Sequence, residues 1–149
     1  MRATVPSEML PEASLLDTSV VIDLPEYQAA GLLTSVVAVS AVTFAELSYG
    51  VALASTRFEA VARARRLAEL KRVFRPLAFD AACADAYGDL AALVRDAGRA
   101  PRPRRIDIMI ASVAVANRLP LMTANPDDFK GMERLLELLP TSCHPQPSA

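Results

Sequence analysis

Short apolar runs rich in β-branched residues alternate along this chain with longer segments in which apolar residues recur at helical spacing. The clearest of these runs is VVAVSAV at residues 36–42, which predicts a buried strand. Strands that alternate with helices are joined by right-handed crossovers and form a parallel sheet. We therefore expect an α/β fold, a three-layer sandwich whose central parallel sheet has about four to five strands flanked by helices.

The same patterns predict where the elements begin and end. Strands are expected at residues 14–17, 36–42, 119–123 and 135–139, with an edge strand at 73–79 because Pro76 interrupts that run. Helices are expected at residues 43–54, 55–72, 80–97 and 106–117, and also directly after Asp17, where Thr18 or Ser19 could serve as the cap. Thr43 and Glu46 match a capping box, and Gly98 is suited to close the helix at 80–97. The predicted inner stripe of the helix at 55–72 is Phe58, Val61, Leu67 and Leu70.

The chain length of 149 residues suits one domain. We expect that domain at residues 14–140, preceded by an N-terminal extension at 1–13 and followed by a flexible tail at 141–149. An apolar fraction of 52% argues against a disordered chain. Apolar runs are shorter than the roughly 18 residues of a membrane span, and residues 1–11 lack the apolar core of a secretory signal.

The chain has too few cysteines and histidines to form a disulfide framework or a zinc site. The two cysteines, Cys83 and Cys143, cannot by themselves staple a secreted fold. The single histidine, His144, lies in the predicted tail. A cytoplasmic protein without a membrane segment is the expectation.

Charge is distributed unevenly along the chain. The formal net charge is −1, which argues against a whole molecule that binds nucleic acid by its charge. Residues 57–105, however, contain twelve Lys and Arg against six Asp and Glu, a net charge of +6. A basic middle segment therefore accompanies acids that are placed elsewhere.

Several of these acids lie where predicted strands end. Asp17 ends the first strand, Glu46 follows the second, and Asp128 follows the strand at 119–123 together with Asn125. Asp107 opens the helix after an arginine-rich loop. In an open parallel sheet these places lie at the carboxyl ends of the strands, where such folds bind ligands. Four distant segments are therefore expected to converge on one crevice.

Crowded carboxylates are costly unless a proton or a cation neutralises them. Oxygen ligands without Cys or His suit a hard ion such as Mg²⁺ or Mn²⁺, and a cation at such a site can activate water for attack on phosphorus. Each acid also has a purely structural interpretation: Asp17 or Asp107 could cap a helix, Glu46 could complete a capping box, and Asp127 and Asp128 could be turn residues. Convergence of four segments favours the functional interpretation.

Three strings of the sequence resemble the PIN-domain family, and specifically the VapC-like toxins of type II toxin–antitoxin pairs. They are LLDTSVVIDL, VSAVTFAELSYGV and RRIDIMIASVAVANRLPLMTANPDDF. The resemblance runs from about Leu15 to Leu139. Each string is a weak signal by itself, whereas their order and separation together are quite specific.

The resemblance implies a metal-dependent endoribonuclease, a hydrolase that cleaves RNA phosphodiester bonds with metal-activated water. It implies Asp17 and Asp107 as direct ligands of Mg²⁺ or Mn²⁺, with Glu46 completing the acidic cluster. The family's fourth position, often Asp, falls on Asn125, which carries no charge and leaves the number of metal ions open; Asp128 could partly compensate. The supporting hydrogen-bonding residues would be Thr18, Ser19 and Thr123.

The resemblance also implies partners. These are a cognate VapB-like antitoxin, an RNA substrate for which tRNA or ribosomal RNA is typical of relatives, and, by analogy alone, a second copy in a homodimer. The arginine-rich loop, with Arg99, Arg102, Arg104 and Arg105, could bind RNA phosphates or could be a solvated linker. Val51, Ala52 and Ala54 could receive an antitoxin segment or belong to the core.

Two other functions remain open at this point. A catalytically weak or inactive PIN fold could bind RNA or protein and inhibit translation sterically, as the uncharged Asn125 suggests. A phosphatase that uses Asp17 as a nucleophile is the third hypothesis, but Ser19 stands where a second Asp would be expected.

Overall fold

The computed structural model describes residues 10–141. Most of the expected N-terminal extension and tail, including Cys143 and His144, therefore lies outside the described residues. The domain limits stay a prediction. Between residues 10 and 141 the structure contains no helix with the length and apolar character needed to cross a membrane.

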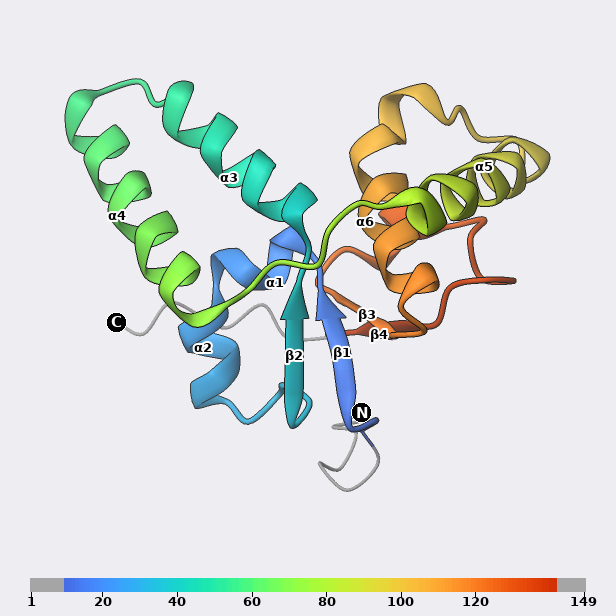
Figure 1. Ribbon diagram of the computed structural model, residues 1–149, viewed down its shortest axis with the longest axis horizontal. Coiled ribbons are helices and arrows are strands. Elements are labelled where there is room, and N and C mark those ends of the chain that lie inside the picture. Colours follow the sequence, from blue (N-terminus) through green and yellow to red (C-terminus); the bar gives the residue numbers. More distant parts are fainter. Residues whose placement is uncertain (1–9, 142–149) are drawn as a thin grey trace.

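A four-stranded parallel sheet forms the centre of the described chain. Its strands are β1 (Ala13–Leu16), β2 (Val36–Val39), β3 (Leu121–Thr123) and β4 (Leu138–Pro140), in the order β2-β1-β3-β4. Figure 1 shows the arrows of β1 and β2 pointing to the same edge, from which helices α1 and α3 begin. The predicted α/β fold with a parallel sheet is confirmed.

The helices are α1 (Thr18–Ile22), α2 (Leu24–Ala29), α3 (Ala41–Ala52), α4 (Arg57–Val73), α5 (Ala81–Asp96) and α6 (Arg105–Ala116). Two 3₁₀ turns, Arg102–Arg104 and Pro126–Phe129, lie on either side of α6 in the sequence. Gly98 has a positive φ of 77° directly after α5, as expected of a residue that closes a helix.

The predicted edge strand at 73–79 is wrong. Only Leu77 pairs with the sheet, through one isolated bridge to Ser40. Leu77 donates to the carbonyl of Val39 and accepts from the N–H of Ala41. Pro76, the preceding residue, has no N–H to donate and prevents the pairing from extending.

Two predicted helix caps are also wrong. The N-cap of α3 is Ser40, whose hydroxyl accepts from the N–H of Thr43, so α3 begins earlier than the sequence suggested and Glu46 has no capping role. The N-cap of α1 is Asp17 rather than Thr18 or Ser19. Ser40 directly follows β2. Its hydroxyl accepts a hydrogen bond from an N–H in the first turn of α3, and this bond favours the start of a helix over a continued strand.

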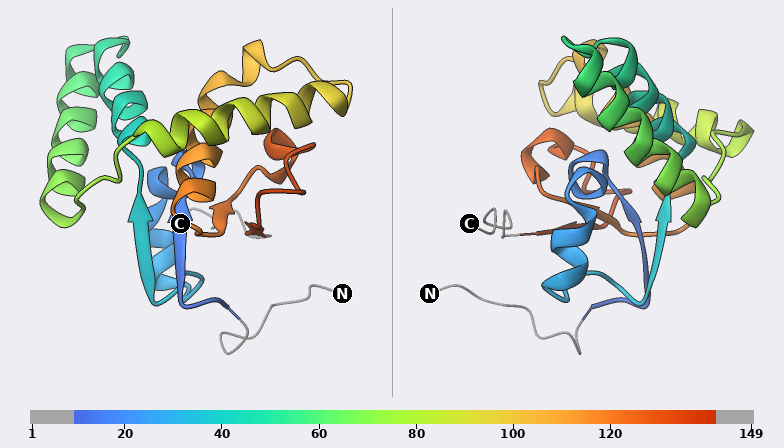
Figure 2. Two further views of the ribbon diagram at one scale, coloured as in Figure 1. Left: turned by 45° about the vertical axis from the view of Figure 1, so that its right-hand side comes forward. Right: turned by 90° about the vertical axis from the view of Figure 1, so that its left-hand side faces the viewer.

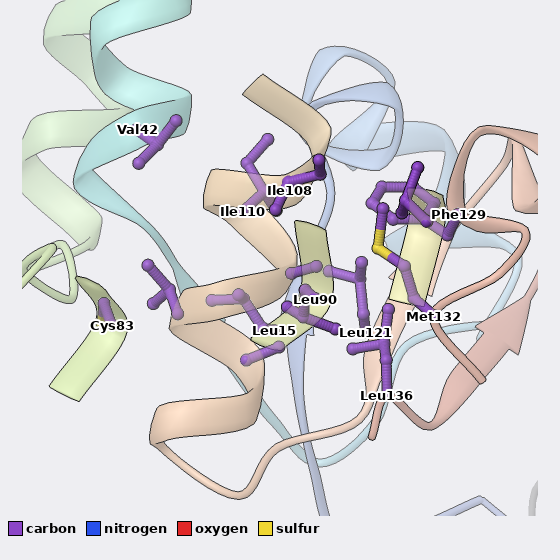
Figure 3. Packing of buried hydrophobic residues seen from close by; sticks show 14 residues of the cluster. Leu15, Val42, Cys83, Leu90, Ile108, Ile110, Leu121, Phe129, Met132 and Leu136 are labelled. Carbon is purple, nitrogen blue, oxygen red and sulfur yellow. The ribbon is translucent and has the colours of Figure 1, made fainter. Parts of the chain in front are cut away.

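Residues of the strands alternate between two separate hydrophobic clusters. Leu15 and Leu121 belong to the cluster packed against α5 and α6, which Figure 3 shows, whereas Leu16 and Met122 belong to the cluster formed with α1 to α4. Because successive side chains of a strand point to opposite faces, the sheet is buried on both sides. This arrangement confirms the three-layer architecture.

Helices α3 and α4 form an antiparallel hairpin that stands beside the sheet, and both Figure 1 and Figure 2 show this arrangement. Leu67 and Leu70 are the buried residues of α4, as predicted. Phe58 and Val61 were expected on the same inner stripe, but their exposed fractions are 85% and 53%. They lie in the first turns of α4, at the end of the hairpin farthest from the sheet, where no other element covers them.

Candidate active site

Asp17 is a buried carboxylate at the carboxyl end of β1. Its Oδ1 accepts from the N–H of Thr18 at 2.8 Å, and its Oδ2 accepts from the hydroxyls of Ser19 and Thr123, both at 2.8 Å. Burial raises the pKa of Asp17 even though these donors favour the charged form. Asp17 therefore caps α1 and is at the same time held in a fixed orientation by residues of α1 and β3.

Glu46 reaches the same edge of the sheet from α3. Its Oε1 accepts from the hydroxyl of Thr18 at 2.7 Å, and that hydroxyl lies 3.0 Å from the hydroxyl of Thr43. Burial raises the pKa of the half-buried Glu46, and the charge of Asp17 raises it further. Thr43 was not expected in the site because the sequence suggested a capping role for it.

Asp107 lies in the first turn of α6. The N-cap position of this helix is Arg104, so the capping interpretation of Asp107 is wrong. Burial, followed by the charges of Asp128, Asp17 and Glu46, raises the pKa of Asp107 to about 6, against an opposing effect of Arg104. Four carboxylates from four segments therefore act on one another electrostatically.

The segment after β3 closes the site. The N–H of Ala124 donates to the hydroxyl of Ser19 at 3.1 Å, and the N–H of Asn125 donates to the hydroxyl of Thr123 at 3.0 Å. The side chain of Asn125 is exposed, whereas Asp128 is half-buried and raises the pKa of both Asp17 and Asp107. Asp128 rather than Asn125 supplies the fourth charge. Asp127 is an exposed turn residue paired with Lys130 at 3.1 Å.

The chemistry of this donor set suits a divalent cation. Across residues 10–141, Asp17, Glu46 and Asp107 have no ion pair with a basic side chain, and the charge of Arg104 offsets only part of the repulsion at Asp107. No three His, Cys, Asp or Glu side chains of this part of the chain gather closely enough to hold one ion together. Mg²⁺ commonly takes only one or two carboxylates directly and keeps several waters, so its binding does not require a three-acid cluster.

Arg99 of the arginine-rich loop has structural contacts that the sequence did not suggest. Arg99 donates to the backbone carbonyls of Asp127 and Lys130, at 3.0 and 2.8 Å, and so ties the segment after β3 to the end of α5. Arg104 lies near Asp107, and its Nε is buried without a hydrogen-bond partner. Arg102 and Arg105 are exposed.

Comparison with known proteins identifies the family of this chain. Residues 14–135 match the model of the PIN domain. A search of curated proteins gives no significant match. Solved structures with the same fold include a member of the VapBC family of toxin–antitoxin systems, VapBC-5, from Mycobacterium tuberculosis, at 31% identity and a TM-score of 0.73, covering 88% of this chain and 100% of that chain.

Two further solved structures agree with this match. FitAcB from Neisseria gonorrhoeae is 27% identical with a TM-score of 0.69, covering 87% of this chain and 99% of the other. VapBC2 from Rickettsia felis, bound to a DNA fragment from its promoter, is 25% identical with a TM-score of 0.68 and the same coverage. The chain therefore belongs to the PIN-domain family, whose members are generally nucleases, and within it to the VapC-like toxins.

Proposed function

We propose that this chain is a Mg²⁺- or Mn²⁺-dependent endoribonuclease and the toxic component of a toxin–antitoxin pair. The observation that carries the proposal is a set of four acids that act on one another and that form no ion pair with a basic side chain within residues 10–141: Asp17, Glu46, Asp107 and Asp128. Partly buried carboxylates that lack an ion pair destabilise a fold, and they persist where function requires them.

In this proposal Asp17 and Asp107 bind the cation directly and Glu46 completes the acidic cluster. When bound, the cation supplies a Lewis acid that offsets the negative charge developing on the phosphodiester. Thr18, Ser19 and Thr123 orient the Asp17 carboxylate through the three hydrogen bonds described above. A fixed carboxylate needs no reorganisation as the reaction proceeds, which lowers the barrier.

Glu46 is suited to move a proton. Thr18 occupies its Oε1 and leaves Oε2 without a hydrogen-bond partner among the described residues. Because burial raises the pKa of Glu46, this carboxylate is a stronger base than an exposed glutamate. We assign Oε2 of Glu46 as the atom that accepts a proton from the attacking water.

The proposed partners are RNA and a VapB-like antitoxin. Several solved structures with this fold are VapBC assemblies, which supports a partner protein for this chain. Ala52 is exposed beside the exposed Tyr49 and Leu53 at the end of α3, and an antitoxin segment could cover this apolar surface. The RNA class, tRNA or ribosomal RNA, and a homodimer are proposed by analogy with relatives only.

The test is RNA cleavage by the purified chain freed of any partner. Cleavage is expected with Mg²⁺ or Mn²⁺ and should stop with EDTA. Asp17→Ala and Asp107→Ala are each expected to lower the cleavage rate by about 10³-fold or more, because charge stabilisation in a transition state contributes on this scale. Undiminished cleavage by both variants, with folding verified by circular dichroism, would falsify this mechanism.

The alternative is a PIN fold that inhibits translation sterically. It is motivated by the uncharged Asn125 and by the lack of a three-acid cluster among residues 10–141. Growth inhibition that persists in the Asp17→Ala variant would favour this alternative over the nuclease, whereas its disappearance supports cleavage.

A further inference from the structure

A cavity of about 500 Å³ adjoins the acidic site. It lies between α1, α3 and α4, and two of its lining residues, Thr18 and Glu46, are also members of the acidic site. The cavity and the acids are therefore parts of one continuous surface. A chain-like substrate that places a phosphodiester at the acids can therefore place a neighbouring unit in this cavity.

The wall opposite these residues is formed by α4 and is basic. Arg63 and Arg66 line the cavity there, together with the apolar side chains of Leu67 and Leu70. The whole of α4 carries six Lys and Arg against two Glu, a net charge of +4. The cavity thus combines an acidic edge, a basic wall and an apolar floor.

The two arginines differ in how their charge is used. Arg63 pairs with Glu59 and donates to the carbonyl of Gly50 at 2.6 Å, so its charge is compensated and its position is fixed. Arg66 donates only to the carbonyl of Val21, at a long 3.3 Å, and no acid within the described range pairs with it. Within the described residues, Arg66 therefore has no acidic partner, and most of its guanidinium N–H groups are not used in hydrogen bonds.

We propose that this cavity binds the RNA nucleotide next to the cleaved phosphodiester, and that Arg66 binds the backbone phosphate of that nucleotide. The inference rests on the proposed nuclease function and assigns a substrate subsite to it. A guanidinium binds phosphate through two parallel hydrogen bonds, and the apolar floor can contact the sugar or base. This placement gives the polyanion an attractive wall beside carboxylates that otherwise repel it.

Charge favours RNA over a peptide as the occupant. A phosphate backbone matches both the free cation at Arg66 and the net positive charge of α4. An apolar peptide segment would use the floor but would leave Arg66 without a partner, which is costly when water is excluded. Binding of a partner protein in the cavity is retained as an outcome of the test.

The test measures binding without cleavage. A fluorescently labelled single-stranded RNA oligonucleotide is titrated with the full chain in EDTA and followed by anisotropy, for the wild type, Arg66→Gln, Arg66→Lys and Arg65→Gln. Arg65 is the matched control, because it is the adjacent exposed arginine of α4 and does not line the cavity. Each glutamine variant removes one positive charge from the same helix.

Arg66→Gln is expected to weaken RNA binding about 10-fold, on the scale of a lost charge-assisted hydrogen bond. It should also reduce the slope of log K against log salt by about 0.7, the contribution of one phosphate contact in single-stranded nucleic acid. Arg66→Lys should retain most of this slope, because the charge remains. Arg65→Gln should change affinity by less than about 2-fold, as a peripheral charge does.

A cleavage experiment separates this inference from the proposed function. With Mg²⁺ present, Arg66→Gln should raise KM and leave kcat nearly unchanged, because it removes binding that ground state and transition state share. If the wild type binds RNA through Arg66 but does not cleave it, the nuclease proposal fails and the binding site stands. If Arg66→Gln binds RNA no more weakly than Arg65→Gln, the subsite is overturned. The subsite is likewise overturned if Arg66→Gln weakens only the complex with a partner protein.

Discussion

The two sides of the central sheet are packed very differently. In α6, residues Ile108, Ile110, Ala111, Ser112, Val113 and Ala114 are all buried. In α4, which is longer, only Leu67 and Leu70 are buried, while Phe58 and Val61 stay exposed. The side formed by α5 and α6 is a conventional core, whereas the α3–α4 hairpin is anchored at one end and open at the other.

Because of this difference, the packed side holds a carboxylate of the site in place, whereas the hairpin side leaves room for a substrate to reach the site. Asp107 stands on the tightly packed helix α6, so its position is fixed by the core beneath it. Glu46 stands on the hairpin side, next to the cavity. The acidic site lies where the two sides meet, and Asp17 at the end of β1 joins them. A substrate is therefore expected to approach from the hairpin side.

The largest expected effect sharpens the contrast in packing. Ile110→Ala should lower the free energy of unfolding by about 3 kcal/mol, because it removes buried methyl groups from a filled core and leaves a cavity. Phe58→Ala, at a position that is 85% exposed, should change it by less than about 0.5 kcal/mol. Urea unfolding followed by circular dichroism measures both. A large loss in Phe58→Ala would mean that the hairpin end is covered in solution.

A metal titration tests which side supplies the ligands. Mg²⁺ at ten times its dissociation constant should raise the free energy of unfolding by about 1.4 kcal/mol, because it binds only the folded chain. This gain should disappear in Asp107→Asn and be retained in part by Glu46→Gln, since we place Asp107 among the direct ligands. Thermal unfolding with and without Mg²⁺ gives the answer. If Mg²⁺ stabilised Asp107→Asn but not Glu46→Gln, the direct ligand would be Glu46 on the hairpin side instead of Asp107.

The smallest expected effect is the change in stability with pH that the carboxylate of Asp107, on the packed side, causes. Because the pKa of Asp107 is raised from 3.8 to about 6, the folded state keeps its proton while the unfolded state loses it between these values. The stabilising contribution is thus fully present below pH 3.8 and is lost as pH rises through 6. In EDTA at pH 7, Asp107→Asn should therefore be more stable than the wild type by about 1 kcal/mol, a value reduced for the partial exposure of the side chain.

This gain should shrink towards pH 4, where the wild-type carboxyl is protonated in the folded state. Asp89→Asn is the control, because Asp89 is exposed on α5 and no change is expected there. Unfolding free energies at pH 4 and pH 7 provide the comparison. An unchanged Asp107→Asn at pH 7 would show that the repulsion among the acids is already relieved without a metal.

Much of the fold could be predicted because local patterns agree with it. The strand predicted at 14–17 and the helix predicted at 80–97 kept nearly their predicted limits as β1 and α5, whereas the strand predicted at 36–42 ends already at Val39. The errors at Ser40 and at residues 73–79 arise because the local sequence is compatible with more than one structure. Ser40 is compatible with a strand or a cap, and Leu77 belongs to an apolar run that Pro76 keeps from pairing beyond a single bridge.

The residues of the candidate site were predicted more completely than their roles. Asp17, Glu46 and Asp107 were each suspected of capping, but only Asp17 has that role, and it is also part of the site. The sequence left open whether Arg99 binds RNA or lies in a solvated linker, and it did not suggest that Arg99 holds the segment after β3. Arg66 seemed only one of several surface charges of α4, and no pattern in the sequence distinguished it from Arg65.

The sequence alone determined which residue types end each strand, because the alternation of apolar runs and polar ends is a local property of the chain. It therefore placed the carboxylates at one edge of a parallel sheet. Only the tertiary structure decided which charges remain without a partner. Burial and the hydrogen bonds that hold these side chains depend on residues far apart in the chain, as in Asp17 with Thr123 or Arg66 with Val21. The packing of distant segments, rather than local sequence, thus separates a structural arginine from one that is free to bind a phosphate.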